Sequence, residues 1–227
     1  MPSPAKIAII VAGGSGSRMG STTPKQFLEL NGKPVLHYTI RAFMEAYEDM
    51  HIVLVVPPAH RGSIGAVLAA FGRPPSVTIA EGGETRFHSV KNGLQFVKQD
   101  AVVFVHDGVR PLVSPALIRT CYEQALLKGS AIPAIPLKDS IREVDTVGNN
   151  AADRTRFRII QTPQTFLSGL LIPAFDQPYD PLFTDEATVV ERSGHAVHLV
   201  EGEEQNIKIT RPQDLVIASA FLNDSLR

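Results

Sequence analysis

Short apolar runs alternate with helical patterns along the first 135 residues, and this alternation constrains the fold more than any other feature. Five runs rich in β-branched residues occupy 7–12, 51–56, 77–80, 101–105 and 131–135. A strand that is apolar at successive positions is buried on both faces of its sheet. Strands that alternate with helices form mostly parallel sheets with helices on both faces. The sequence therefore predicts an α/β, Rossmann-like fold.

The segments between these runs carry apolar residues at helical spacing. They predict helices over about 35–48, 64–71, 84–98 and 117–125. Farther along we expect a short apolar helix after Pro163, another that Thr184 can cap, a strand near 196–200 and a last helix from about 212. Because ligands bind outside the carboxyl ends of parallel strands, the loops after the first, third and fourth strands should meet at one site.

The regular alternation breaks between about 137 and 160. Residues 138–144 alternate in part, a polar turn follows at 148–150, and a strongly basic run occupies 154–158. This pattern predicts a β-hairpin that projects from the domain, rather than a further strand–helix unit. We expect a single domain over 1–227 that carries this projecting arm.

The bulk composition excludes several classes of protein. A net charge of −1 offers no general attraction for nucleic acid or an anionic membrane. The single cysteine, Cys121, excludes an intramolecular disulfide and a cysteine-cluster metal site, and its apolar helical neighbours indicate a buried thiol. The apolar run 7–12 is too short for a secretory signal or a membrane span, so we expect a cytoplasmic protein.

A glycine-rich loop follows the first strand directly, and it contains Ala12, Gly13, Gly14 and Gly16. Glycines let the backbone turn tightly and bring its N–H groups close to an anion. The loop lacks the third glycine of a dinucleotide fingerprint and the Gly-Lys-Ser/Thr ending of a P-loop. Instead, Arg18 and Lys25 follow in the same connection. Two cations beside a bed of amides suit a triphosphate whose α-phosphorus accepts an attacking oxygen.

Several separate blocks of the sequence match one family in order and spacing. They are 12–19 with 24–27, 82–83 with 86, 89–90, 106–111, 161–164, 184–187 and 206–212. Over about 7–222 the chain resembles the 2-C-methyl-D-erythritol 4-phosphate cytidylyltransferases of non-mevalonate isoprenoid synthesis. The resemblance implies a nucleotidyltransferase that joins CMP from CTP to 2-C-methyl-D-erythritol 4-phosphate and releases pyrophosphate.

The resemblance also implies a nucleotide site. Its nucleotide-binding residues are Ala12, Gly13, Gly14, Gly16, Gly82, Gly83 and Ser89. Arg18, Lys25 and Lys208 are implied as the catalytic cations that neutralise charge on the phosphates. Without the resemblance, Ser89 is an ordinary helix residue, and Lys208 is a lone lysine in an apolar strand, where an exposed sheet edge is its usual location.

Asp107 ends the fourth strand, at the edge of the sheet where ligands bind. An acidic residue there can hold the Mg²⁺ that accompanies a nucleotide triphosphate, because magnesium favours one or two carboxylates together with phosphates and water. A helix cap is the alternative role. Arg110, three residues on, can clamp an acceptor phosphate bidentately. We therefore expect Asp107 at a divalent cation and Arg110 at the acceptor.

In the family that the chain resembles, the arm crosses to a partner subunit. This implies a homodimer in which Ser140 and Arg154 help to bind the acceptor, together with Thr184. Ser140 stands where the family more often has threonine, and serine retains the hydroxyl group of threonine. Arg158 stands where the family commonly has tryptophan, and this departure bears on the acceptor rather than on the reaction type. A charged, solvated hairpin is the alternative reading of the arm.

The residues leave three alternative functions. A cytidylyltransferase of the same fold could act on ribitol 5-phosphate instead. A non-catalytic nucleotide-binding regulatory domain is a second alternative, although a mere binder has no need of Arg18, Lys25, Asp107 and Lys208 together. The incomplete glycine fingerprint disfavours a third, a dinucleotide-dependent oxidoreductase. The expected ligands are CTP and a small phosphorylated polyol, with neither nucleic acid nor a membrane as partner.

Overall fold

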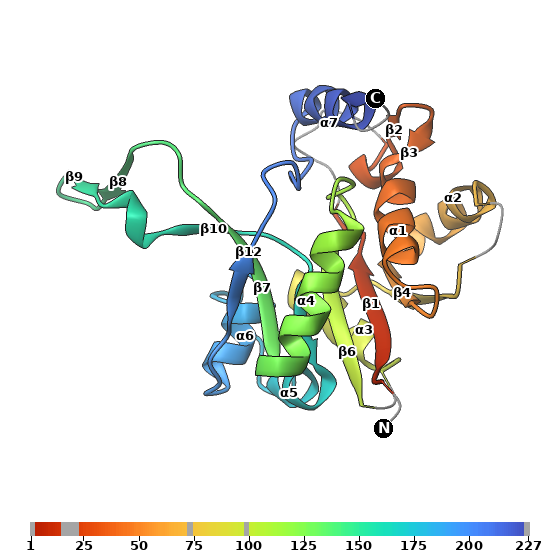
Figure 1. The fold of residues 1–227 in the computed structure, drawn as a ribbon, viewed down its shortest axis with the longest axis horizontal. Coiled ribbons are helices and arrows are strands. Elements are labelled where there is room, and N and C mark those ends of the chain that lie inside the picture. Colours follow the sequence, from red (N-terminus) through yellow and green to blue (C-terminus); the bar gives the residue numbers. More distant parts are fainter. Residues whose placement is uncertain (1–2, 15–22, 72–74, 98–99, 225–227) are drawn as a thin grey trace.

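A computed structural model describes residues 3–14, 23–71, 75–97 and 100–224. Within these ranges eight strands form one sheet, in the order β10-β7-β11-β6-β1-β4-β5 with β12 beside β7. Its parallel centre consists of β1 (Ala5–Val11), β4 (His51–Val56), β5 (Val77–Glu81) and β6 (Ala101–Asp107). β1 lies between β6 and β4 and runs from the N-terminus toward the end of the molecule that carries α7 (Figure 1). The predicted mostly parallel sheet is confirmed.

Two antiparallel strands lie on the other side of β6, and the sequence analysis identified neither. β11 (Gln164–Leu167) lies between β6 and β7 (Ser130–Pro136), and β10 (Arg158–Ile160) pairs with the end of β7. β12 (Leu199–Glu201) is parallel to β7. β11 runs directly into α5 (Ser168–Ala174), so its few apolar residues merge with those of a helix and show no period of their own.

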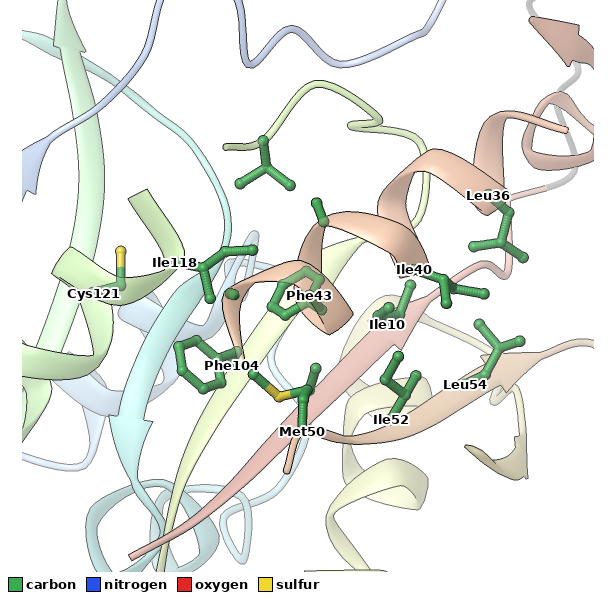
Figure 2. Packing of buried hydrophobic residues seen from close by; sticks show 14 of the residues in the cluster. Ile10, Leu36, Ile40, Phe43, Met50, Ile52, Leu54, Phe104, Ile118 and Cys121 are labelled. Atoms are coloured by element: carbon green, nitrogen blue, oxygen red, sulfur yellow. The ribbon is translucent and has the colours of Figure 1, made fainter. Parts of the chain in front are cut away.

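Different helices cover the two faces of the sheet. α1 (Val35–Ala46), α2 (Ile64–Ala69) and α4 (Pro115–Lys128) pack on one face, and α3 (Arg86–Leu94), α5 and α6 (Glu186–Arg192) pack on the other. Successive strand residues point to opposite faces. Ile10 of β1 therefore packs among residues of α1, β4 and β6 (Figure 2), whereas Ile9 belongs to the core beneath α3.

The core on the α1 and α4 face also holds the cysteine. Cys121 of α4 is fully buried near Ile118 (Figure 2), and burial raises the pKa of its thiol to about 12. The thiol is therefore protonated at ordinary pH and contributes apolar packing. The prediction of a buried structural cysteine is confirmed.

Side-chain caps set the first turns of α3 and α6. Thr85 caps α3 by accepting from the N–H of His88. Asp185 is the N-cap of α6 and forms a reciprocal capping box with Thr188. The expectation that Thr184 caps this helix is wrong: the longer acceptor one residue later reaches the helix N–H, and Thr184 is exposed.

The C-terminal helix α7 (Pro212–Asp224) packs on a separate small cluster that contains Leu30, Val35, Tyr38, Val109, Leu112, Ile209 and Ala218. β2 (Glu29–Leu30) and β3 (Lys33–Pro34) form a hairpin beside it. Asn31 and Gly32 in its turn have φ of 48° and 82°, a conformation that these two residue types adopt readily. The cluster holds the C-terminal part of the chain at the carboxyl edge of the sheet.

The arm projects well away from the main sheet (Figure 1). β8 (Ile141–Val144) and β9 (Asn149–Ala152) pair with each other in a sheet of their own. A short 3-10 turn, Arg154–Arg156, precedes the return into β10. The predicted projecting β-arm is confirmed, although its last residues, 158–160, belong to the main sheet. Among the helices described, none has the length and apolar character needed to cross a membrane.

Candidate active site

A cavity lies at the carboxyl ends of β1, β5 and β6. Within the described ranges its wall consists of Val11, Ala12, Gly13, Gly14, Lys25, Gln26, Gly83, Glu84, Thr85, Arg86, Ser89, Asp107, Val109 and Lys208. The predicted meeting of the loops after the first, third and fourth strands is confirmed. Segments from the start, the middle and the end of the sequence thus share one wall.

Hydrogen bonds hold the start of the glycine-rich loop. The N–H of Ala12 donates to a carbonyl of β4 at 2.8 Å, and the side-chain amide of Gln26 donates to the Ala12 carbonyl at 2.7 Å. The aliphatic stem of Lys25 packs against the loop, since a Cβ at Gly14 would stand 3.6 Å from Lys25 Cε. Lys25 is almost fully buried. Its ammonium group therefore belongs to the same small region as the loop amides.

The second loop, between β5 and α3, requires glycine at position 83. A Cβ there would lie 2.4 Å from the Cβ of His88 and 2.8 Å from its carbonyl carbon. The Gly83 N–H donates to Ser89 Oγ at 3.0 Å, and the Ser89 hydroxyl donates to the Thr85 carbonyl at 2.9 Å. Ser89 thus shapes this loop and keeps one acceptor lone pair for a ligand. Gly82 flanks the cavity wall, with its N–H on a β4 carbonyl.

Asp107, the last residue of β6, is buried and takes part in three ion pairs. Its Oδ1 lies 3.3 Å from Arg86 Nε, and its Oδ2 lies 2.9 Å from Lys208 Nζ and 3.5 Å from Arg110 Nε. Burial acts to raise the pKa of the Asp107 carboxyl, but the three cations hold that pKa well below its usual range. The carboxylate stays ionised and keeps the amine of Lys208, whose side chain is 41% exposed, at the cavity wall.

Arg86 and Glu186 form a pair to which the sequence analysis gave no role in the site. Arg86 lines the cavity, and its guanidinium bridges two carboxylates, with Nε toward Asp107 and Nη1 donating to Glu186 Oε1. Glu186 is fully buried at the start of α6, and burial raises its pKa although Arg86 opposes the rise. Both residues lie in blocks that match the family. Nothing in the sequence, however, indicates that charges 100 positions apart are paired.

Arg110 lies behind the cavity rather than in its described wall. Its Nη1 donates to the backbone carbonyl of Asn206 at 2.7 Å, and its Nε faces Asp107. The buried guanidinium therefore joins the loop after β6 to the segment that leads to Lys208. Binding of the acceptor phosphate by Arg110 stays a prediction.

Lys208 lies in an extended loop between β12 and α7, so its expected place in a strand is wrong. The N–H of Ile209 donates to the loop after β6 at 2.9 Å, and the buried amide of Asn206 donates to the Thr162 carbonyl at 2.9 Å. The alternation of Ile207 and Ile209 reflects packing in the α7 cluster instead of sheet pairing. These contacts fix the backbone on both sides of the lysine.

A hydrogen-bonded chain supports Asp107 from behind. The Asp107 N–H donates to Thr162 Oγ1 at 3.1 Å, and His106 bonds Thr162 through Nδ1 at 3.0 Å and the Arg110 carbonyl through Nε2 at 3.2 Å. Because a carbonyl only accepts, the neutral ring must carry its proton on Nε2 and accept the threonine hydroxyl at Nδ1. Burial lowers the pKa of His106 to about 3, so the ring is neutral at ordinary pH.

The predicted acceptor residues Ser140, Arg154 and Thr184 are exposed and stand apart from the described wall of the cavity. Ser140 directly precedes β8 of the arm, and Arg154 donates to the carbonyl of Lys138 at the base of the arm. Thr184 precedes α6. Their contact with an acceptor stays a prediction.

The cavity unites most of the predicted nucleotide and catalytic residues. Its wall contains Ala12, Gly13, Gly14, Lys25, Gly83, Ser89, Asp107 and Lys208, whereas Gly16 and Arg18 lie outside the described residues. In the described wall the three cations of Lys25, Arg86 and Lys208 outnumber the two carboxylates of Glu84 and Asp107, beside the glycine amides. This combination suits a polyphosphate, because fixed cations and N–H groups stabilise charge on its oxygens. The individual roles of these residues stay predictions.

Comparison with known proteins points to one family. The family model of IspD, 2-C-methyl-D-erythritol 4-phosphate cytidylyltransferase, matches residues 6–224. A relative of that name from Bacteroides fragilis is 46% identical over 217 residues, which cover 96% of this chain and 99% of the relative. Another from Phocaeicola vulgatus is 47% identical over 214 residues, which cover 94% and 98% of the two chains.

Solved structures share the whole fold. The 4-diphosphocytidyl-2C-methyl-D-erythritol synthase of Anaerococcus prevotii superposes with a TM-score of 0.83 at 28% identity, over 97% of this chain and 96% of that one. The 2-C-methyl-D-erythritol 4-phosphate cytidylyltransferase of Thermus thermophilus superposes with a TM-score of 0.75 at 31% identity, over 96% and 99%. The chain therefore belongs to the 2-C-methyl-D-erythritol 4-phosphate cytidylyltransferase family.

Proposed function

We propose that this protein transfers CMP from CTP to 2-C-methyl-D-erythritol 4-phosphate, in the non-mevalonate route to isoprenoid precursors. The observation that carries this proposal is the cationic cavity at the carboxyl edge of the sheet, where Lys25, Arg86 and Lys208 meet a glycine-rich loop. The named relatives match nearly the whole chain, which supports methylerythritol phosphate over ribitol 5-phosphate as the acceptor.

The reaction is a direct in-line substitution. An oxygen of the acceptor phosphate attacks the α-phosphorus of CTP, the bond to the β-phosphate oxygen breaks, and pyrophosphate leaves. The nucleophile is already an anion, so the protein has to supply alignment and charge compensation rather than a general base. We assign Lys25 and Lys208 to the charge on the α-phosphate and the leaving group, with Arg18 as a third cation.

The two glycine-bearing loops bind the nucleotide in this proposal. The amides around Gly13 and Gly14 would approach the phosphates, as they do in other anion-binding loops. The loop at Gly83, with the remaining lone pair of Ser89, would meet the cytosine. Arg110, Ser140, Arg154 and Thr184 would hold the acceptor.

We propose Mg²⁺ as the divalent cation, carried in by the nucleotide. Within the described residues, no group of three or more His, Cys, Asp or Glu could hold a metal ion. One or two carboxylates suffice for Mg²⁺ when phosphates supply the other ligands. Asp107 and the exposed Glu84 offer such oxygens at the cavity wall. A bound Mg²⁺ would withdraw negative charge from the phosphates. The carboxylate of Asp107 would attract the ion and so offset its repulsion by the cations of the wall.

We propose a homodimer in which each arm completes the partner's site. The support is the position of Ser140 and Arg154 on an exposed arm that projects from the body (Figure 1), apart from the described wall of the chain's own cavity. A second chain would bring such residues to the acceptor.

We also propose a cytoplasmic location because the reaction consumes CTP, and cell fractionation tests it.

Pyrophosphate release tests the proposed reaction. The protein is supplied with CTP and Mg²⁺, and with methylerythritol 4-phosphate or ribitol 5-phosphate in parallel. We expect release with methylerythritol phosphate and dependence on Mg²⁺. Release with ribitol phosphate alone would support the reaction type but contradict the proposed acceptor. If folded protein releases no pyrophosphate with either acceptor, the proposed catalysis is wrong. Sedimentation velocity of the same sample measures the oligomeric state.

A further inference from the structure

Glu186 is a buried carboxylate that the proposed reaction leaves without a role. It is 1% exposed and stands outside the described cavity wall. Its Oε1 accepts from Arg86, whereas its Oε2 is buried without a hydrogen-bond partner. A buried carboxylate with an unmet oxygen lowers stability compared with an apolar residue of similar size. Packing alone therefore gives no reason for a glutamate at this position.

Arg86 connects Glu186 to the cavity. Its Nη1 donates to Glu186, and its Nε lies 3.3 Å from Asp107 Oδ1. The side chain of Arg86 is 26% exposed and lines the cavity. A guanidinium is a rigid planar fork. A carboxylate that holds Nη1 therefore also sets the direction in which Nε points.

The orientation of Arg86 affects Lys208, because both side chains pair with Asp107. Oδ2 of Asp107 lies 2.9 Å from the Lys208 amine. An arginine that is free to turn favours bidentate pairing with both oxygens of one carboxylate. Such pairing at Asp107 would compete with Lys208 for Oδ2. Glu186 holds the guanidinium through Nη1 with Nε toward Oδ1, and in this orientation Oδ2 pairs with the lysine.

Glu186 itself is held in place by the neighbouring strand. The N-cap of its helix is Asp185, whose Oδ2 accepts from the Gln164 amide at 2.9 Å. The N–H of Ala187 donates to Gln164 Oε1 at 2.8 Å. Gln164 is the first residue of β11, and β11 pairs with β6, the strand that ends at Asp107. The two carboxylates that Arg86 bridges are thus fixed relative to each other.

We propose that Glu186 is a positioning residue: it directs Arg86 and, through Asp107, aligns Lys208 for cytidylyl transfer. This inference rests on the proposed function. Glu186 touches neither substrate in this scheme, and it acts through Arg86. A purely structural ion pair between α3 and α6 would affect the stability of the fold and leave the chemical step unchanged.

Steady-state kinetics separate these two roles. Glu186→Gln keeps the size of the side chain and removes its charge. We expect kcat to fall about tenfold or more while the KM for CTP changes less than about threefold. Glu191→Gln, an exposed change on the same helix, is the control and should leave kcat at the wild-type value. A wild-type kcat in Glu186→Gln, with only the melting temperature lowered, would overturn the proposal.

A double variant tests whether Glu186 acts through Arg86. Arg86→Gln removes the guanidinium that connects Glu186 to Asp107. Adding Glu186→Gln to this variant should therefore lower kcat by no more than about twofold further. Losses that multiply in the double variant would contradict the proposed connection. Both assays are run at a temperature where circular dichroism shows all variants folded.

A spectroscopic readout distinguishes this inference from the proposed function. The ¹H–¹⁵N signal of Arg86 Nε is assigned by its absence in Arg86→Gln. We expect it to shift in Glu186→Gln and to stay in place in Glu191→Gln. A wild-type protein that releases no pyrophosphate would overturn the proposed function. An Arg86 signal that stays unmoved in Glu186→Gln, in a protein whose wild type is active, would overturn the positioning role.

Discussion

The three ion pairs of Asp107 differ in their access to solvent, and this difference decides which cation can meet a phosphate. The side chain of Lys208 is 41% exposed, whereas that of Arg110 is 10% exposed and is also bound to a backbone carbonyl. Exposed ion pairs exchange partners at low cost, while a buried charge keeps its partner. The Arg86 side chain is 26% exposed and is also bound to Glu186, so Lys208 is the cation of the three that turns most readily from Asp107 to a ligand.

Replacing Lys25 tests charge compensation at a single residue. We expect Lys25→Ala to lower kcat about 100-fold or more, as removal of one transition-state donor does in other enzymes, with a smaller change in the KM for CTP. Lys33→Ala, an exposed change in β3, is the matched control. A loss confined to the KM for CTP would mean that Lys25 binds substrate and transition state equally.

His106 predicts a pH dependence of stability. Its pKa is lowered to about 3 in the folded protein, against about 6.5 in an unfolded chain. Between these values the unfolded state binds more protons, so this residue makes the free energy of unfolding fall as pH decreases. The slope is about 1.4 kcal/mol per pH unit. Below pH 6, the stability gap between wild type and His106→Gln should narrow at about this rate.

Urea unfolding at pH 7, 6 and 5 measures this effect. His195→Gln, at an exposed histidine, serves as the control and should give a curve parallel to that of the wild type. Parallel curves for His106→Gln as well would mean that the buried ring does not stay neutral.

The residues of the cavity differ in how far the sequence could predict them. Lys25 stands close to the glycine-rich loop in the sequence, so its place beside that loop in the cavity wall follows from local spacing. The ion pair of Arg86 with Glu186 depends on β11, which brings α6 beside α3, and the sequence analysis did not identify that strand. An ion pair between residues that are far apart in the sequence can be predicted only when the order of the strands in the sheet is known.

At the scale of elements, the parallel strands were predictable because each is a continuous apolar run between polar segments. His51–Val56 is observed with the predicted bounds, and β6 extends two residues past the prediction, to Asp107. β11 was not predictable by the same rule. It has four residues, two of them polar, and a helix follows with no intervening turn. Its burial comes from neighbours on both sides, which no local pattern reports.

Gly83→Ala tests the contact between the second loop and α3. The new Cβ would stand 2.4 Å from the His88 Cβ, so the loop or the helix must shift. We expect a loss of about 1–3 kcal/mol in the free energy of unfolding, together with weaker CTP binding. Gly65→Ala in α2, with nothing within 4 Å of the new Cβ, should instead gain about 0.5–1 kcal/mol. Equal stabilities of the two variants would contradict this account.

At the scale of the whole molecule, the proposed dimer makes each site composite. The predicted acceptor residues Ser140 and Arg154 lie on the arm, while Lys25 lies at the cavity. If the arm serves the partner's site, a hybrid of Lys25→Ala and Arg154→Ala chains has one site in which both residues are intact. At limiting acceptor, where both variants are impaired, random mixing of the two should then restore about a quarter of the wild-type activity.

Mixing experiments also test the opposite arrangement. Arms that serve their own chain's cavity would leave every site of the hybrid with one defect, so activity would not recover. Each variant alone, refolded in the same way, is the control. Because Arg154→Ala affects acceptor binding, its residual activity should rise with acceptor concentration, whereas that of Lys25→Ala should not.

β1 comes early in the sequence and Lys208 comes late, so the parts of the cavity wall are synthesised at different times. A ribosome delivers the glycine-rich loop early, and its first sheet neighbour, β4, soon afterwards. The lysine that balances Asp107 emerges only after the arm, β11 and β12. A growing chain therefore contains the glycine-rich loop well before it contains Lys208, the last residue in sequence of the described cavity wall.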